Sequence, residues 1–119
     1  MDHTLAVEDL CAGAGSIREA LDTVGSVWAM AVLAALGTEP LRYSELKRRV
    51  AGINDRMLTQ TLHRFVRDGL AQRQGPGHSA YTLTEMGREV SAAVGEFVYV
   101  IMKLAPEVGK ARHRHDSAR

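Results

Sequence analysis

One stretch of the chain decides the fold: residues 54–70, which read NDRMLTQTLHRFVRDGL. Its apolar side chains recur every three or four residues and therefore line one face of a helix: Met57, Leu58, Leu62, Phe65 and Val66. Asn54 is a good N-cap and Gly69 a good terminator, so the stretch predicts a helix over residues 54–69. The opposite face of this helix is entirely polar.

A shorter helix precedes this one. Ser44 is suited to cap a helix over residues 45–50, and Ala51-Gly52-Ile53 forms a tight turn between the two helices. Two helices joined by such a turn make a helix-turn-helix. After Gly69 the pattern predicts two short strands, residues 70–74 and 80–83, around a turn-rich loop at 75–79. These strands would form a wing, and residues 41–43 are also extended.

Further helices flank this unit. Apolar periodicity predicts helices over residues 16–24 and 27–36, and the second is apolar all round, as a central helix is. Thr84 is expected to cap a last helix that runs to about Ala105, where Pro106 interrupts or ends it. The fold class is therefore mainly α with a small β-wing: a winged helix-turn-helix with additional N- and C-terminal dimerisation helices. We expect a flexible N-terminal arm over 1–15, this domain over 16–105 and a polar C-terminal tail over 106–119.

Composition excludes several classes of protein. A chain of 119 residues suits one domain, and 45% hydrophobic residues are too many for a disordered chain. No apolar run approaches the roughly 18 residues of a membrane span, and one cysteine permits neither an internal disulfide nor a cysteine zinc cluster. The first residues lack the basic end and apolar stretch of a secretory signal. We therefore expect a cytoplasmic protein with no membrane partner.

The net charge of +1 conceals a strong asymmetry. Residues 1–41 carry six acids and one base, whereas residues 42–78 carry eight bases and three acids. Residues 79–119 carry six bases and five acids. A basic middle third indicates a polyanionic partner, and its position on the helix-turn-helix favours double-stranded DNA.

The polar face of helix 54–69 is suited to read bases in the major groove, because its side chains match the hydrogen-bonding edges exposed there. The first residues of such a helix reach the bases, so the predicted base-reading residues are Arg56, Thr59, Gln60 and His63. We interpret Asn54 and Asp55 as cap and first-turn residues. Other residues are predicted to touch the DNA backbone: Arg42, Ser44, Lys47, Arg48, Arg49, Arg64, Arg67, Arg73 and His78. Arg64 and Arg67 could alternatively pair with Asp68. The wing over 73–80 would lie on the backbone or in the minor groove.

Several short motifs occur in an informative order: Gly25-Ser26-Val27-Trp28, Arg42-Tyr43-Ser44-Glu45-Leu46, Gly52-Ile53, Met57-Leu58-Thr59-Gln60-Thr61-Leu62, Asp68-Gly69-Leu70 and Tyr81-Thr82-Leu83-Thr84-Glu85-Met86-Gly87. In this combination the chain resembles the HxlR-type family of bacterial winged helix-turn-helix transcriptional regulators, over about residues 16–104. The resemblance implies a homodimer, a palindromic operator and control of a nearby gene. We expect a repressor that blocks polymerase sterically.

The sequence agrees with dimerisation. The last helix carries an apolar stripe too broad for one small domain to cover, and the first helix offers a partner surface. The predicted dimer interface comprises Ile17, Leu21, Val90, Val94, Phe97, Val98, Ile101 and Leu104. The two recognition helices of a two-fold dimer would lie about 34 Å apart, which is one turn of DNA.

A rival interpretation is a winged-helix module for protein–protein assembly without DNA binding. Such a module should present apolar residues on the outer face of helix 54–69, and this chain presents none there. An enzyme is not expected, because the chain lacks a glycine-rich phosphate loop, a metal-binding histidine pair on a helix and a serine elbow. No cofactor is predicted, and an unknown small-molecule effector stays open.

Three other features have weaker interpretations. Cys11 is a possible redox sensor, but the neighbouring carboxylates Glu8 and Asp9 disfavour a reactive thiolate. The His113-Arg114-His115 tail has spacing too short for a convincing metal site, so no metal is predicted. Trp28, Met30 and Met102 could line a ligand cavity, although core packing is the favoured role for them.

Overall fold

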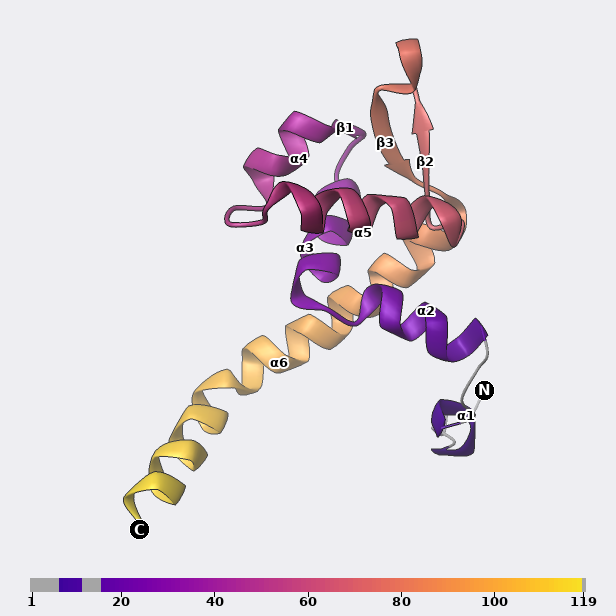
Figure 1. The fold of residues 1–119 in the computed structure, drawn as a ribbon. Coiled ribbons are helices and arrows are strands. Elements are labelled where there is room, and N and C mark those ends of the chain that lie inside the picture. Colours follow the sequence, from indigo (N-terminus) through magenta and orange to yellow (C-terminus); the bar gives the residue numbers. More distant parts are fainter. Residues whose placement is uncertain (1–6, 12–15, 119) are drawn as a thin grey trace.

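The computed structural model describes residues 7–11 and 16–118 (Figure 1). The elements follow in the order α1 (Val7–Cys11), α2 (Ser16–Val24), α3 (Val27–Leu36), β1 (Leu41–Arg42), α4 (Tyr43–Arg49), α5 (Asp55–Arg67), β2 (Ala71–Gln74), the 3-10 turn η1 (Pro76–His78), β3 (Ala80–Leu83) and α6 (Glu85–Ser117). The predicted winged helix-turn-helix is confirmed: α4 and α5 form the helix-turn-helix, and β2 and β3 form the wing.

Helix α3 is the centre of the core. It contacts α2, α4, α5, α6 and β3, which is why its sequence is apolar on every side. Ser26 caps it, because the Ser26 hydroxyl accepts a hydrogen bond from the Ala29 amide at 3.0 Å. Helix α5 packs across α3 through Leu58, Leu62 and Phe65, all of them buried. Burial of each such side chain stabilises the fold by about 1.5–3 kcal/mol.

The buried face of α5 is rotated slightly from the face that the apolar spacing predicts. Val66 was assigned to this face, but 39% of its surface is exposed, whereas Thr61 is buried. The ideal helical period places Val66 at the margin of the stripe, and the structure turns that margin towards the wing. Asn54 caps the helix as predicted, because its Oδ1 accepts from the Met57 amide at 2.8 Å.

The sheet has the strand order β1-β3-β2 and is antiparallel throughout. Tyr81 on the central strand pairs with Leu41 on one side and with Arg73 on the other. The wing tip contains Gly75 and Gly77 at φ values of +82° and +66°, which side chains other than glycine rarely adopt. The tight wing therefore depends on these glycines.

Helix α4 begins earlier than expected. It starts at Tyr43, and Ser44 lies inside its first turn instead of capping it. The cap is supplied from the third helical residue, since Glu45 Oε1 accepts a hydrogen bond from the Arg42 amide at 2.9 Å. Local sequence favoured serine as the cap, but the strand pairing of Arg42 places the helix start directly after it.

A close approach of α6 to the chain just before β2 explains the Thr84-Glu85-Met86-Gly87 motif. Thr84 donates to the Gly69 carbonyl at 2.6 Å and accepts from the Gly87 amide at 3.0 Å. Gly87 is buried, and a Cβ atom at this position would lie 1.9 Å from the Leu70 carbonyl oxygen. Only glycine permits this contact between α6 and the chain before β2.

The two ends of the chain differ from the expected arm and tail. Helix α6 continues through Pro106 to Ser117, so the expected helix end at about Ala105 is wrong. The described residues of α6 beyond Val98 are exposed, so water can bond to the carbonyl that proline leaves without an amide partner. In the expected arm, residues 7–11 form α1, which packs on α2, and the rest of the arm lies outside the described residues.

Among the described residues, no single helix is long and apolar enough to cross a membrane. Helices α2 and α3 reach that length only together, and they are bent by 80° at their junction.

Candidate nucleic-acid interface

Helix α5 presents the four predicted base-reading residues on one exposed surface. Arg56, Thr59, Gln60 and His63 all line the same shallow depression, together with Asp55. The opposite face of α5 is anchored in the core, so the helix holds these side chains outward on a rigid support. The structure thus brings the four residues together, as their spacing predicted.

The wing continues this surface. A second hollow is lined by Thr59 and His63 from α5 and by Arg73 and Tyr81 from the wing. Arg73 Nε donates to the His78 carbonyl at 3.0 Å, and its guanidinium lies 5.4 Å from the centroid of the Tyr81 ring. Arg73 is therefore held against the wing, beside the recognition helix.

The predicted backbone contacts fall into three groups. Four are exposed on β1 and α4, the elements that precede the recognition helix in the chain: Arg42, Ser44, Arg48 and Arg49. Arg73 and His78 lie on the wing, and Arg64 and Arg67 lie on the last turn of α5. Arg67 Nε pairs with Asp68 Oδ1 at 3.1 Å, which confirms the alternative given for that residue.

Lys47 differs from the other basic residues, because it is paired within the protein. Its ammonium lies 3.0 Å from Asp55 Oδ1, across the turn of the helix-turn-helix. The Tyr43 hydroxyl donates to the same oxygen at 2.8 Å and lies 3.3 Å from Thr59 Oγ1. The sequence placed Asp55 only in the first turn of the helix and did not predict this cluster of Tyr43, Lys47 and Asp55.

The cluster sets the charge of Asp55. The hydrogen bond from Lys47, followed by that from Tyr43, holds the pKa of the Asp55 carboxyl below its ordinary value. An aspartate is ionised in the neutral range even at its ordinary pKa, and the lowering extends this range further into acid; the Lys47–Asp55 pair therefore carries no net charge at neutral pH. The signal available in the sequence was an acidic residue in a basic segment, since residues 42–78 contain only three acids.

The end of α5 is tied to α2. Thr23 is buried, and its hydroxyl donates to Asp68 Oδ2 at 2.7 Å. This hydrogen bond, assisted by the Arg67 guanidinium, holds the pKa of Asp68 below its ordinary value, although partial burial acts in the opposite direction. The recognition helix and α2 are thus joined by a hydrogen bond to a charged group.

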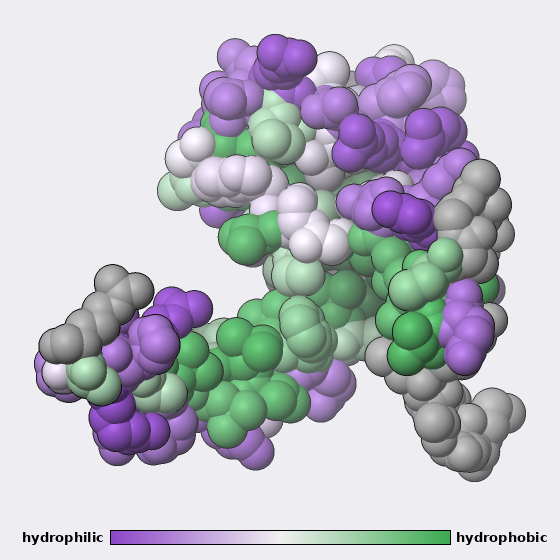
Figure 2. Space-filling model, turned by 60° about the horizontal axis from the view of Figure 1, so that its bottom comes forward, coloured by the Kyte–Doolittle hydropathy of each residue, from purple (hydrophilic) through white to green (hydrophobic). Residues whose placement is uncertain are grey.

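The predicted dimer interface divides into two parts. Val90 and Val94 pack against the core of their own chain, and Val98 is partly buried. About half of the surface of Phe97 and Ile101 is exposed, and so is much of the surface of Ile17, Leu21 and Leu104. Figure 2 shows that the projecting arm of α6 is apolar over its middle and polar at its free end.

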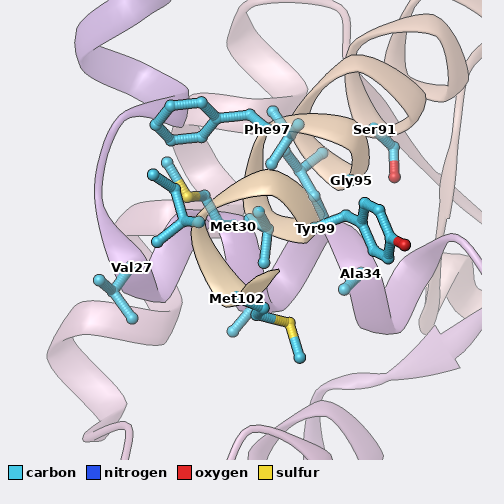
Figure 3. Close-up of a pocket in the computed structure, with 13 residues that line it drawn as sticks. Val27, Met30, Ala34, Ser91, Gly95, Phe97, Tyr99 and Met102 are labelled. Carbon is cyan, nitrogen blue, oxygen red and sulfur yellow. The ribbon is translucent and has the colours of Figure 1, made fainter. Parts of the chain in front are cut away.

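A groove of about 760 Å³ lies between α3 and α6 (Figure 3). Its walls are almost wholly apolar and include Met30, Phe97 and Met102, with Ser91 and Tyr99 supplying hydroxyl groups. Trp28 is absent from this lining and packs against the core instead, as the favoured interpretation required. Met30 and Met102 do line a groove, which corrects their assignment to core packing.

A helix-turn-helix built on a buried central helix, with a polar recognition helix beside a two-stranded wing, defines a winged-helix DNA-binding protein. Comparison with known proteins gives the particular family. The HxlR-like helix-turn-helix profile matches residues 23–108, and the chain belongs to this family of transcriptional regulators, which are not enzymes.

Two relatives and one solved structure illustrate the similarity. The uncharacterised HTH-type transcriptional regulator YtfH of Escherichia coli K12 is 36% identical over 95 residues, covering 76% of this chain and 75% of the relative. An uncharacterised HTH-type regulator of Methanothermobacter thermautotrophicus is 38% identical, over 63% of this chain and 60% of its own length. The structure of the regulator YtfH from Salmonella typhimurium superposes with a TM-score of 0.76 at 31% identity, over 82% of this chain and 91% of that one.

Proposed function

We propose that this transcriptional regulator is a homodimeric repressor that binds a palindromic operator in the cytoplasm. The observation that carries the proposal is the hollow on α5 that Arg56, Thr59, Gln60 and His63 line together. All four side chains are exposed, and each can donate or accept a hydrogen bond at a base edge.

The surrounding charges support docking on the DNA backbone. The elements before α5 in the chain, β1 and α4, expose Arg42, Arg48 and Arg49. The wing after α5 carries Arg73, which lines a hollow together with α5 residues. Phosphate contacts from these positions would fix the register of α5 in the major groove. The wing would then lie along the backbone or the adjacent minor groove.

The exposed apolar side chains of α6 and α2 support the homodimer. About half of the surface of Phe97, Ile101 and Leu104 on α6 is left uncovered by the described part of their own chain. A second copy would cover them, and two-fold symmetry would present two copies of α5 to two half-sites. A dimer on such an operator would exclude polymerase from an overlapping promoter.

To test the proposal, the protein is used to enrich DNA duplexes from a random pool. Fluorescence anisotropy then measures how tightly it binds the enriched duplexes and unselected ones. We expect selective binding with a steep salt dependence, of about 0.9 in log–log slope for each phosphate contact. The ratio of affinities for enriched and unselected duplexes should fall at least about 5-fold in the Arg56→Ala, Gln60→Ala double variant. This is the cost of one lost base contact.

Arg112→Ala is the matched control, because it removes one positive charge from the exposed far end of α6. It should leave discrimination unchanged. Failure of the wild-type protein to bind any duplex at low salt would overturn the proposal. That result would favour the protein–protein assembly module.

A further inference from the structure

Asp55 places a carboxylate among the predicted base-reading residues. It is the first residue of α5, and it lines the same hollow as the four predicted base-reading residues. The other two acids of the basic segment point elsewhere: Glu45 accepts from the Arg42 amide, and Asp68 accepts from Thr23. Asp55 is therefore the acid that would face the DNA.

A carboxylate at this place would ordinarily be repelled by phosphates. Here the Lys47 ammonium and the Tyr43 hydroxyl both bind Oδ1, at 3.0 Å and 2.8 Å. No residue in the described part of the chain donates to Oδ2, and 73% of the Asp55 side chain is exposed. The pair is neutral as a whole, but Asp55 lines the hollow and its Oδ2 keeps its capacity to accept a hydrogen bond.

We propose that Asp55 is a specificity-determining residue whose Oδ2 accepts a hydrogen bond from the exocyclic amino group of a cytosine in the major groove. The inference rests on the proposed function, since it requires α5 to enter that groove. The first residues of a recognition helix reach base edges, and Asp pairs with cytosine N4. Guanine and thymine present acceptors there, and adenine places its N7 acceptor beside its amino group, so a carboxylate disfavours all three.

Tyr43 and Lys47 are positioning residues in this arrangement. One hydroxyl, that of Tyr43, lies within hydrogen-bond distance of both Asp55 Oδ1 and Thr59 Oγ1, which are one helical turn apart. It therefore orients two groove-facing side chains at once. A phenylalanine would keep the ring and lose only this oxygen.

The test compares the duplexes enriched from a random pool by the wild-type protein and by Asp55→Asn. The wild-type protein should enrich half-sites with one invariant C·G pair, and replacing that pair should weaken its binding by about 5-fold or more. Asp55→Asn should lose this preference and shift towards adenine, which asparagine recognises through N6 and N7. Asp116→Asn is the control, because it makes the same chemical change at the exposed end of α6. It should enrich the same half-site as the wild-type protein.

Two further variants complete the design. Asp55→Ser gives a second test if the asparagine variant fails to fold, and it should accept any base at this position. Tyr43→Phe should weaken the cytosine preference while keeping the wild-type salt slope, because a positioning residue adds no phosphate contact.

The outcomes separate the two proposals. An identical half-site, selected with equal strength by the wild-type protein and both Asp55 variants, would overturn the role of Asp55 alone. A wild-type protein that enriches no sequence would overturn the proposed function itself. Unchanged cytosine preference in Tyr43→Phe would remove Tyr43 from the mechanism.

Discussion

The hydroxyl of Thr23 in α2 donates a hydrogen bond of 2.7 Å to Asp68 at the end of α5. Through it, a helix of the proposed dimer surface is joined directly to the helix proposed to read DNA. Thr23 is buried, and Asp68 is also held by Arg67, so this contact fixes the end of α5 against α2. In a dimer, the position of α2 would thereby set the separation of the two recognition helices.

Thr23→Val should destabilise the protein by about 1–2 kcal/mol, since it keeps the shape and leaves Asp68 Oδ2 without its donor. Urea unfolding measures this change. The control is Thr38→Val, because Thr38 is an exposed residue whose hydroxyl donates to the nearby Ala35 carbonyl and to no charged group in the described part of the chain. Equal losses in both variants would contradict a special role for the Thr23–Asp68 contact.

Asp68 also predicts an acid dependence of stability. Its pKa is lower in the folded protein than in the unfolded chain, so its ionised form stabilises the fold above a pH of about 4. This stability is lost as the pH falls through the folded pKa. The free energy of unfolding of Asp68→Asn, followed from neutral pH downward, should therefore decline less steeply than that of the wild-type protein. Parallel curves would refute the assignment.

Two glycines of α6 should respond oppositely to alanine. Gly87→Ala places a methyl group against the Leu70 carbonyl and should cost about 1–3 kcal/mol of stability through overpacking. Gly95→Ala meets nothing within 4 Å in the single chain, and it should be neutral or stabilising by up to about 1 kcal/mol. Thermal unfolding of the two variants at one protein concentration tests the pair, and a stable Gly87→Ala variant would argue against the close approach.

Phe97→Asp should convert the proposed dimer to a monomer, because it places a charge in the centre of the exposed apolar part of α6. Light scattering gives the mass directly. Val66→Asp makes a comparable change on α5, where 39% of the valine is exposed, and it should leave the mass unaltered. A dimeric Phe97→Asp protein would show that the copies associate through another surface.

Local sequence determined the element order and the recognition helix. Asn54 and Thr84 accept from amides three residues ahead, and apolar spacing places Leu58, Leu62 and Phe65 on one face. These features depend on neighbours within about one helical turn, so the sequence alone contains them.

Tertiary structure decided the rest. Lys47 meets Asp55 across the turn between α4 and α5, and Thr23 meets Asp68 because α2 packs on the end of α5. The same apolar stripe of α6 packs Val90 and Val94 against the core and leaves Phe97 about half exposed, beside the groove between α3 and α6. Pro106 fails to end α6 because solvent surrounds the helix there. Each of these outcomes depends on which distant surface lies opposite a residue, and local periodicity carries no such information.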